Sequence, residues 1–396
     1  MTTAIVQRVV IYPLVIPMRW SVSHAQAQRA VSDPVVVSVE LGNGMVGFGE
    51  ALPRSDPARE SVDSIIDAAR SVFLPFMLEF HPQSFPAALE AIEALPWTDA
   101  AGRPVPAARA AVELALLDAV LRTYNRGIGE VAGWMGIPGF GQPGSIKRIR
   151  YSGVLAFADS ARSLKMLRLL YWAGLRHFKL EIGTPDDRAL LGRVAGYLRK
   201  PIERGNATLR VDANGTWTKD EAIDWLAETK DLSIAAVEQP LPRGTEDELA
   251  ILRDLFETVL VHDESLNTLE DGQRLIELGV ADGFNIGLGK CGGMLPSLRL
   301  AALARRSNVR IQLGCMIGET AVLSCAGLRF LEACPGVQWA EGCWGSFLLS
   351  RDVSTRRVRF GLGGKPPRIG DAGLGADVDV ARLRALCCDK PIVSNL

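Results

Sequence analysis

Four short stretches share one pattern: Phe178-Lys179-Leu180-Glu181, Val211-Asp212-Ala213-Asn214, Val237-Glu238-Gln239-Pro240 and Val261-His262-Asp263-Glu264. Each is an apolar run, typical of a β-strand, that stops at a charged residue. Asp212, Glu238 and Asp263 follow one another at intervals of roughly 25 residues, which is the repeat of a (β/α)₈ barrel of about 250 residues. The pattern predicts neighbouring parallel strands that each end in a carboxylate.

Those strand-end carboxylates suggest a metal site. Neighbouring strand ends aim anionic groups at one point, where the groups repel one another unless a cation lies between them. A hard divalent ion meets that need, most simply Mg²⁺, with Mn²⁺ as an alternative. The alternative for any one of these residues taken alone is an ordinary turn or helix-cap role. Three of them at a matched period make Asp212, Glu238 and Asp263 the candidate metal ligands.

The same period extends over most of the chain. Helical patterns, such as residues 220–226 and 269–278, separate the apolar runs. A closed parallel barrel is therefore predicted, with an open doubly wound sheet as the alternative. The predicted strands end near Gly153, Glu181, Asp212, Glu238, Asp263, Gly287, Gly314 and Glu341.

The flanking segments predict a second, smaller unit. Residues 35–41 are rich in valine and lead through a glycine turn into another apolar run, and residues 106–122 have helical spacing. We therefore predict an α/β protein: an N-terminal α+β cap over residues 1–130, a TIM barrel over 145–345 and a C-terminal segment over 346–396 that returns to the cap. Residues 19–32 lack a strand pattern and are predicted to be a loop, either a binding lid or a merely solvated segment.

The composition narrows the range of partners. The formal net charge of the 396 residues is −1 and lysine and arginine do not cluster, which argues against a nucleic-acid or anionic-membrane partner. The seven cysteines lie in the last third of the chain without paired spacing, as expected for reduced thiols in the cytoplasm. The apolar run at residues 9–16 is short and contains Pro13, which favours a strand over a signal peptide or membrane span.

The chain resembles the enolase superfamily, and within it the muconate lactonizing enzyme (muconate cycloisomerase) and mandelate racemase-like proteins. The resemblance implies Mg²⁺ bound by Asp212, Glu238 and Asp263, a small carboxylate substrate, abstraction of the proton next to the carboxylate to give an enediolate, and a homo-oligomer. It rests on Val46-Gly47-Phe48-Gly49-Glu50, Asp212-Ala213-Asn214, Glu238-Gln239-Pro240, Asp263-Glu264-Ser265, Lys290-Cys291-Gly292-Gly293, Gly314-Cys315-Met316-Ile317 and Gly373-Leu374-Gly375.

The chain departs from the family pattern at the acid/base positions. The second barrel strand usually ends Lys-x-Lys, and here the second lysine is Glu181. The opposed lysine of the sixth strand aligns with Gly287. The candidates for proton transfer are then Glu181, Lys179 beside it, and Lys290, which lies three residues past the usual position. A Lys179–Glu181 pair that only balances charge is the structural alternative.

These observations favour an isomerase or lyase. Gly287 leaves one face of the substrate without a catalyst, so a cycloisomerase or β-eliminating lyase is expected over a two-base racemase or epimerase. A metal-binding homologue without turnover is the other alternative. Dipeptide substrates are not expected, because Ala340-Glu341-Gly342 stands where dipeptide epimerases have Asp-x-Asp. We expect substrate contacts from Trp20, His24, Asn214 and Glu319.

Overall fold

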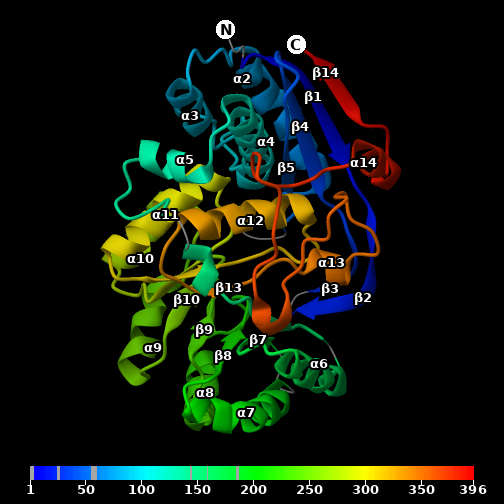
Figure 1. Cartoon of the computed structure of the whole chain (residues 1–396). Helices are drawn as coiled ribbons and strands as arrows, with labels where there is room; N and C mark the ends of the chain where they lie inside the picture. The colour runs from blue at the N-terminus through cyan, green and yellow to red at the C-terminus, as the bar shows by residue number, and fades with distance from the viewer. Residues whose placement is uncertain (1–3, 25–26, 55–59, 143–144, 158, 184–186) are drawn as a thin grey trace.

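The chain forms an α+β cap above a (β/α) barrel (Figure 1). The computed structural model describes residues 4–24, 27–54, 60–142, 145–157, 159–183 and 187–396. In Figure 1 the cap sheet is blue, except for the red C-terminal strand that joins it, and the barrel lies below.

The barrel is a sheet of eight parallel strands in which each strand pairs with its neighbours in sequence. Ser152 N donates a hydrogen bond of 2.8 Å to Ala340 O, and a bridge joins Tyr151 to Ala340, so that the last strand meets the first. The sheet is therefore closed, which confirms the predicted fold class and excludes the open sheet. The strands are β6 (Gly153–Leu155), β7 (His177–Glu181), β8 (Thr208–Asp212), β9 (Ala236–Glu238), β10 (Leu260–His262), β11 (Gly283–Ile286), β12 (Arg310–Leu313) and β13 (Val337–Ala340).

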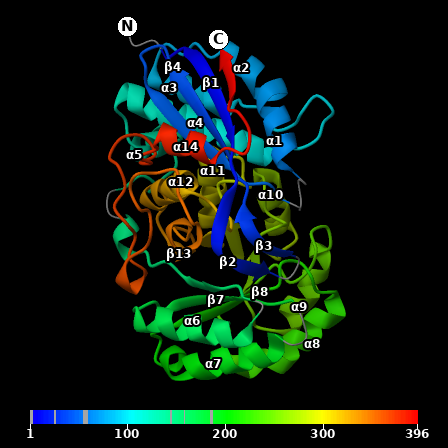
Figure 2. The ribbon, with the colours of Figure 1, turned by 90° about the vertical axis from the view of Figure 1, so that its right-hand side faces the viewer.

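Helices follow the strands and cover the outside of the barrel (Figures 1 and 2). Local side chains cap the N-termini of several of them; Thr218, for example, accepts from Glu221 N, and Thr268 accepts from Asp271 N. The helices are α6 (Ser160–Trp172), α7 (Asp187–Glu203), α8 (Lys219–Thr229), α9 (Leu249–Leu255), α10 (Leu269–Glu277), α11 (Met294–Arg306), α12 (Ala321–Ala333) and α13 (Gly345–Leu348).

The cap contains an antiparallel sheet in the order β14-β1-β4-β5. The C-terminal segment crosses back and pairs β14 with β1, so both ends of the chain build this sheet. The strands are β1 (Val6–Pro13), β4 (Val35–Leu41), β5 (Val46–Ala51) and β14 (Ile392–Asn395), and the helices are α1 (Val62–Ala68), α2 (Leu74–Leu78), α3 (Phe85–Glu93), α4 (Pro106–Tyr124), α5 (Ile128–Trp134) and α14 (Val380–Leu386).

Helix α4 packs against β5 at close range. A Cβ at Gly49 would overlap Ala111 O, and a Cβ at Gly47 would overlap Ala115 O, so only glycine lets strand and helix approach this closely. The sequence predicts one apolar face on this helix, yet residues 106–121 are all buried. The helix is enclosed because the sheet covers one side of it and the barrel helices cover another. Across the described residues, no helix has both the length and the apolar character needed to cross a membrane.

Buried carboxylates of the cap accept hydrogen bonds from the first turns of two barrel helices. Glu113 accepts from Met294 N at 2.9 Å and from Leu295 N at 2.8 Å, at the start of α11. Glu50 accepts from Thr320 N at 2.8 Å and from Leu323 N at 2.9 Å, at the start of α12. These bonds satisfy helix amides that have no partner within the helix, and they fix the cap over the barrel mouth.

The loop prediction for residues 19–32 is wrong. Strands β2 (Ile16–His24) and β3 (Ala27–Ser32) form an antiparallel hairpin that lies between the cap sheet and the barrel (Figure 2). Polar residues on this hairpin dilute the apolar pattern by which strands are recognised. The hairpin is stabilised by contacts with a distant segment of the chain: Met18 forms a β-bridge with Leu349, and Val22 packs with Leu348.

Candidate active site

The strand register brings the predicted carboxylates together. Glu181 is the register partner of Asp212, and Asp212 is the register partner of Glu238, so β7, β8 and β9 end side by side. Asp263 follows the next strand, β10, directly. Asp212 and Glu238 are only 3% and 1% exposed. The barrel thus places buried carboxylates at adjacent strand ends, as the sequence predicts.

The ammonium of Lys179 lies among four carboxylates. Its Nζ is 2.9 Å from Asp212 Oδ2, 2.8 Å from Glu341 Oε2, 3.4 Å from Glu238 Oε1 and 3.7 Å from Glu181 Oε1. Lys179 and Glu181 share a face of β7 because they are two residues apart. The pair therefore belongs to a larger ionic network and is not an isolated salt bridge.

Burial and mutual repulsion shift the pKa values of these groups. Burial raises the pKa of Glu181 from 4.5 to about 7. Burial, with the nearby charges of Glu181 and Glu238, raises the pKa of Asp212 well above its usual range. Burial by itself would lower the pKa of Lys179, but Glu238, Glu341 and the other two carboxylates outweigh it and raise that pKa well above normal. Lys179 is therefore held in its charged form.

Asn214 positions the carboxylate of Glu181. Its backbone has a φ of 51°, in the left-handed region that asparagine tolerates better than most residues. From there its Nδ2 donates a hydrogen bond of 2.6 Å to Glu181 Oε2, and its backbone N donates to Asp212 Oδ1 at 3.0 Å. One residue thus orients the side chains at the ends of two strands.

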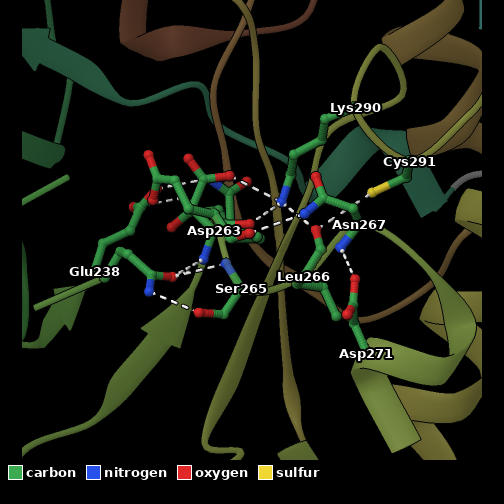
Figure 3. A network of polar contacts seen from close by, with 12 residues as sticks. Glu238, Asp263, Ser265, Leu266, Asn267, Asp271, Lys290 and Cys291 are labelled. Atoms are coloured by element: carbon green, nitrogen blue, oxygen red, sulfur yellow. Dashed lines mark hydrogen bonds and ion pairs between the residues drawn. The ribbon is translucent and has the colours of Figure 1, made fainter. Parts of the chain in front are cut away.

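On the other side of the site, Lys290 holds the loop that carries Asp263 (Figure 3). Its Nζ donates to the backbone oxygens of Asp263 and Leu266 at 2.5 and 2.6 Å, and it lies 2.9 Å from Asp263 Oδ1. Burial would raise the pKa of Asp263, but the nearby cations Lys290, Arg54 and Lys179 together outweigh it and lower that pKa. Gln239 Oε1 accepts from Asp263 N and from Ser265 N at 3.0 and 3.2 Å, which adds a second restraint on this loop.

A cavity of about 220 Å³ opens above these groups. Its lining includes the predicted residues Trp20, Asn214 and Glu319, together with Arg29 and Arg54 of the cap. The side chain of the remaining candidate, His24, lies outside the described part of the structure.

Glu319 lies in the wall of this cavity. Its Oε1 accepts from Ser324 Oγ at 2.8 Å, and its Oε2 accepts from Met316 N at 3.3 Å. Burial raises the pKa of Glu319 to about 8.

The pattern of the family described as "Enolase C-terminal domain-like" matches residues 163–382, which is more than half of the chain. The chain belongs to the enolase superfamily. It is 29% identical over 356 residues to muconate cycloisomerase 1-2 of Acinetobacter lwoffii, covering 88% of this chain and 86% of the relative. It is 32% identical over 306 residues to the hydrophobic dipeptide epimerase of Roseobacter litoralis, covering 75% of this chain and 79% of the relative.

Solved structures of the superfamily share the fold. The dipeptide epimerase from Cytophaga hutchinsonii, complexed with Mg and the dipeptide D-Ala-L-Val, superposes with a TM-score of 0.81 over 99% of this chain and 100% of that chain, at 19% identity. The named relatives are isomerases, and this superfamily member is an enzyme as the sequence predicts.

The donor set suits the hard divalent ion that the superfamily implies. The predicted ligands are all carboxylates on adjacent strands, and oxygen ligands are what Mg²⁺ prefers. Within the described part of the chain, two buried cations, Lys179 and Arg210, form ion pairs with the four carboxylates Glu181, Asp212, Glu238 and Glu341. A buried surplus of two negative charges is costly unless a cation or protons neutralise it.

The carboxylates do not yet converge. Among the residues that the structure describes, no three Asp, Glu, His or Cys side chains form a group able to hold a metal ion. Lys179 holds Asp212 and Glu238, and Lys290 holds Asp263. The three predicted ligands lie at adjacent strand ends, but their carboxylates contact lysines.

Gly287 is the position at which the resemblance to the superfamily implies an acid/base lysine. A Cβ at Gly287 would lie 3.4 Å from Lys290 Cγ and 3.5 Å from Lys290 Cε, so the Lys290 stem runs along the empty position. The ammonium of Lys290 continues to Asp263 and Leu266. The aliphatic part of the Lys290 side chain therefore fills the space of the missing side chain, while its ammonium binds the loop that follows β10.

Sequence reasoning missed several polar residues inside the barrel. Arg210 lies 3.0 Å from Glu341 Oε1 and also donates to Gln312. Gln312 Nε2 and Asn285 Nδ2 donate to the two oxygens of Glu238, at 2.8 and 2.6 Å. The sequence did contain a signal for these residues, namely polar residues within apolar strands. Arg210, for example, is two residues from Asp212 on β8, so both side chains lie on the same face of the strand.

Proposed function

We propose that the chain is a Mg²⁺-dependent enzyme that removes the proton α to the carboxylate of a small organic acid to give an enediolate, and that it is a cycloisomerase or a β-eliminating lyase. The observation that carries the proposal is the position of Glu181. Its carboxylate lines the cavity beside Asp212. It stands at the strand end where the resemblance to the superfamily implies an acid/base lysine. Gly287, which also lines the cavity, has no side chain to serve the other face.

Asp212, Glu238 and Asp263 would hold the ion. When bound, Mg²⁺ supplies the Lewis acidity that neutralises the charge developing on the substrate carboxylate. Lys290 and Gln239 serve this site by fixing the backbone of Asp263. Asn285 and Gln312 orient Glu238.

Glu181 takes the proton in this scheme. Of the four carboxylates around Lys179 it is the farthest from the ammonium, and Asn214 fixes its direction. Lys179 is assigned to charge stabilisation, because its ammonium contacts four carboxylates and has no free electron pair to accept a proton. After the first step, Glu181 returns the proton to a leaving group or to the enediolate on the same face.

The cap closes the site. Trp20, Arg29 and Arg54 line the cavity from above, and excluding water strengthens the electrostatic interactions beneath them. Glu319 lines the wall and contacts the substrate in this scheme. Trp20 is also stacked with Arg162 of α6, whose guanidinium lies 6.0 Å from the ring centroid, so the hairpin is tied to the barrel rim.

The second candidate is a racemase or epimerase, because relatives of this chain carry those names. That reaction needs a donor on the face served by Gly287, and Lys290 would have to leave Asp263 to supply it. A homologue that binds metal without turnover is the third candidate, since both usual lysines are absent.

One experiment separates these candidates. A panel of small carboxylates is incubated with the protein and Mg²⁺ in D₂O, and α-deuterium is followed by NMR. Stereospecific incorporation from one face, lost in Glu181→Gln, supports the proposal. Deuterium entering both enantiomers at comparable rates identifies a racemase. If the protein catalyses no exchange in any carboxylate but still binds Mg²⁺, the homologue without turnover is correct.

A further inference from the structure

The ammonium of Lys179 occupies the oxygens that the proposed metal ion needs. Its Nζ lies 2.9 Å from Asp212 Oδ2 and 3.4 Å from each oxygen of Glu238. Two of the three proposed ligands are therefore already bound to a cation that belongs to the chain. The Lys179 side chain is 6% exposed, so bulk water screens this charge little.

A divalent ion and this ammonium cannot both bind the same carboxylates at full strength. Like charges a few ångströms apart repel strongly in a buried site, where the effective dielectric constant is low. The remaining oxygen of Asp212, Oδ1, accepts from Asn214 N at 3.0 Å. Each oxygen of these two ligands thus has a donor from the protein, and an incoming ion must displace at least one.

Lys179 has an alternative set of partners that leaves those ligands free. Glu341 Oε2 is 2.8 Å from its Nζ, and Glu181 Oε1 is 3.7 Å away. Neither residue is a proposed metal ligand. A rotation of the lysine toward Glu341 would keep its charge neutralised while exposing Asp212 and Glu238.

We propose that Lys179 is a built-in counter-ion that competes with the divalent ion for Asp212 and Glu238, and that metal binding moves its ammonium away from these two residues and onto Glu341. This inference rests on the metal site of the proposed function. It accounts for the absence of a convergent metal-binding group among the described residues. It also makes Lys179 a determinant of metal affinity, a role separate from any contact with substrate.

The test is the affinity for Mg²⁺ alone, measured by titration calorimetry at alkaline pH so that the carboxylates stay ionised. Lys179→Met keeps the length of the side chain but removes its charge, and should bind Mg²⁺ at least about tenfold more tightly than the wild type. Lys179→Arg keeps a cation and should not gain affinity. Lys230→Met removes an exposed lysine of the barrel surface and controls for net charge.

The outcomes are separable. If the wild type binds Mg²⁺ and Lys179→Met binds it equally or more weakly, the competition is overturned and the metal site stands. If only Lys179→Met binds, the competition is supported, and if neither protein binds, both proposals fail.

A structure of the wild type with Mg²⁺ tests the same point if Lys179→Met does not fold. Release of the Lys179 ammonium from Asp212 and Glu238 supports the inference. Retention of both contacts beside the bound ion overturns it.

Discussion

Asn214 Nδ2 donates a hydrogen bond of 2.6 Å to Glu181 Oε2, from a backbone held at a φ of 51°. The contact links the residue that follows β8 to the last residue of β7. It fixes the direction of the Glu181 carboxylate, whose other oxygen, Oε1, lies 3.7 Å from Lys179 Nζ. Orientation matters here because proton transfer requires the base within hydrogen-bonding reach of the proton that it takes.

Asn214→Gly should therefore lower the rate of α-proton exchange without abolishing it, by about 10- to 100-fold, because glycine keeps the left-handed backbone but cannot orient Glu181. Glu181→Gln should abolish the exchange. Asn308→Gly is the matched control, since Asn308 is also left-handed, at a φ of 56°, but follows α11 away from the cavity. Equal losses in the two glycine variants would show that backbone conformation, and not the hydrogen bond, is responsible.

Asp212→Asn should eliminate high-affinity Mg²⁺ binding, because it removes an anionic oxygen ligand that a hard cation requires. Calorimetric titration with MgCl₂ measures the effect. Asp282→Asn is the control: Asp282 is another barrel carboxylate, but it accepts from Leu260 N and pairs with Arg253 at the opposite ends of the strands. Unchanged affinity in Asp212→Asn would remove Asp212 from the metal site.

Alanine at Trp20 or Arg29 should change the order of preference among carboxylate substrates and leave Mg²⁺ affinity unchanged. Both residues line the cavity from the hairpin of the cap, above the strand ends that carry the carboxylates. Specificity constants over a substrate panel, together with Mg²⁺ titrations, measure the two effects. An identical order of preference in wild type and variants would mean that the hairpin does not select the substrate.

Glu113 should make the stability of the protein depend on pH. Burial raises its pKa from 4.5 to about 7, so the folded protein holds this proton more tightly than the unfolded chain does. Its contribution to stability is present below pH 4.5 and is lost as the pH rises through about 7. Relative to Glu113→Gln, the wild type should lose up to ~3 kcal/mol of unfolding free energy across that window.

Urea denaturation at a series of pH values measures this difference. Glu90→Gln, on the exposed face of α3, provides the control and should follow the wild type throughout. Parallel profiles for the wild type and Glu113→Gln would show that the proton on Glu113 does not contribute.

The barrel and its strand-end carboxylates were predictable because their signal is local. Asp212 and Glu238 each follow an apolar run at a regular spacing, and parallel pairing then sets them side by side. The hairpin at residues 16–32 was not predictable in the same way, since Met18 and Val22 are stabilised by contacts with residues 348–349. Long-range partners of this kind leave no periodic trace in the sequence.

The network around Lys179 was predictable only in part. The proximity of Lys179 and Glu181 follows from their spacing on one strand. The contact with Glu341 depends on closure of the barrel between β13 and β6, which brings the eighth strand end within reach. The conformation of the Lys290 side chain depends on the space left by the missing side chain at Gly287. The sequence does not predict the conformation of a long side chain of this kind.

Strands β1 and β14 are neighbours in the cap sheet, but in the sequence all eight barrel strands lie between them. During synthesis β1 precedes the eight barrel strands and β14 follows them, so one edge of β1 has no partner until the barrel strands have been made. During that interval the edge of β1 opposite β4 is unpaired, and an unpaired strand edge is a surface to which other chains can add strands. The barrel must therefore fold, and β14 must pair with β1, faster than other chains associate with the unpaired edge of β1. Slow folding of the barrel would make the cap prone to aggregate.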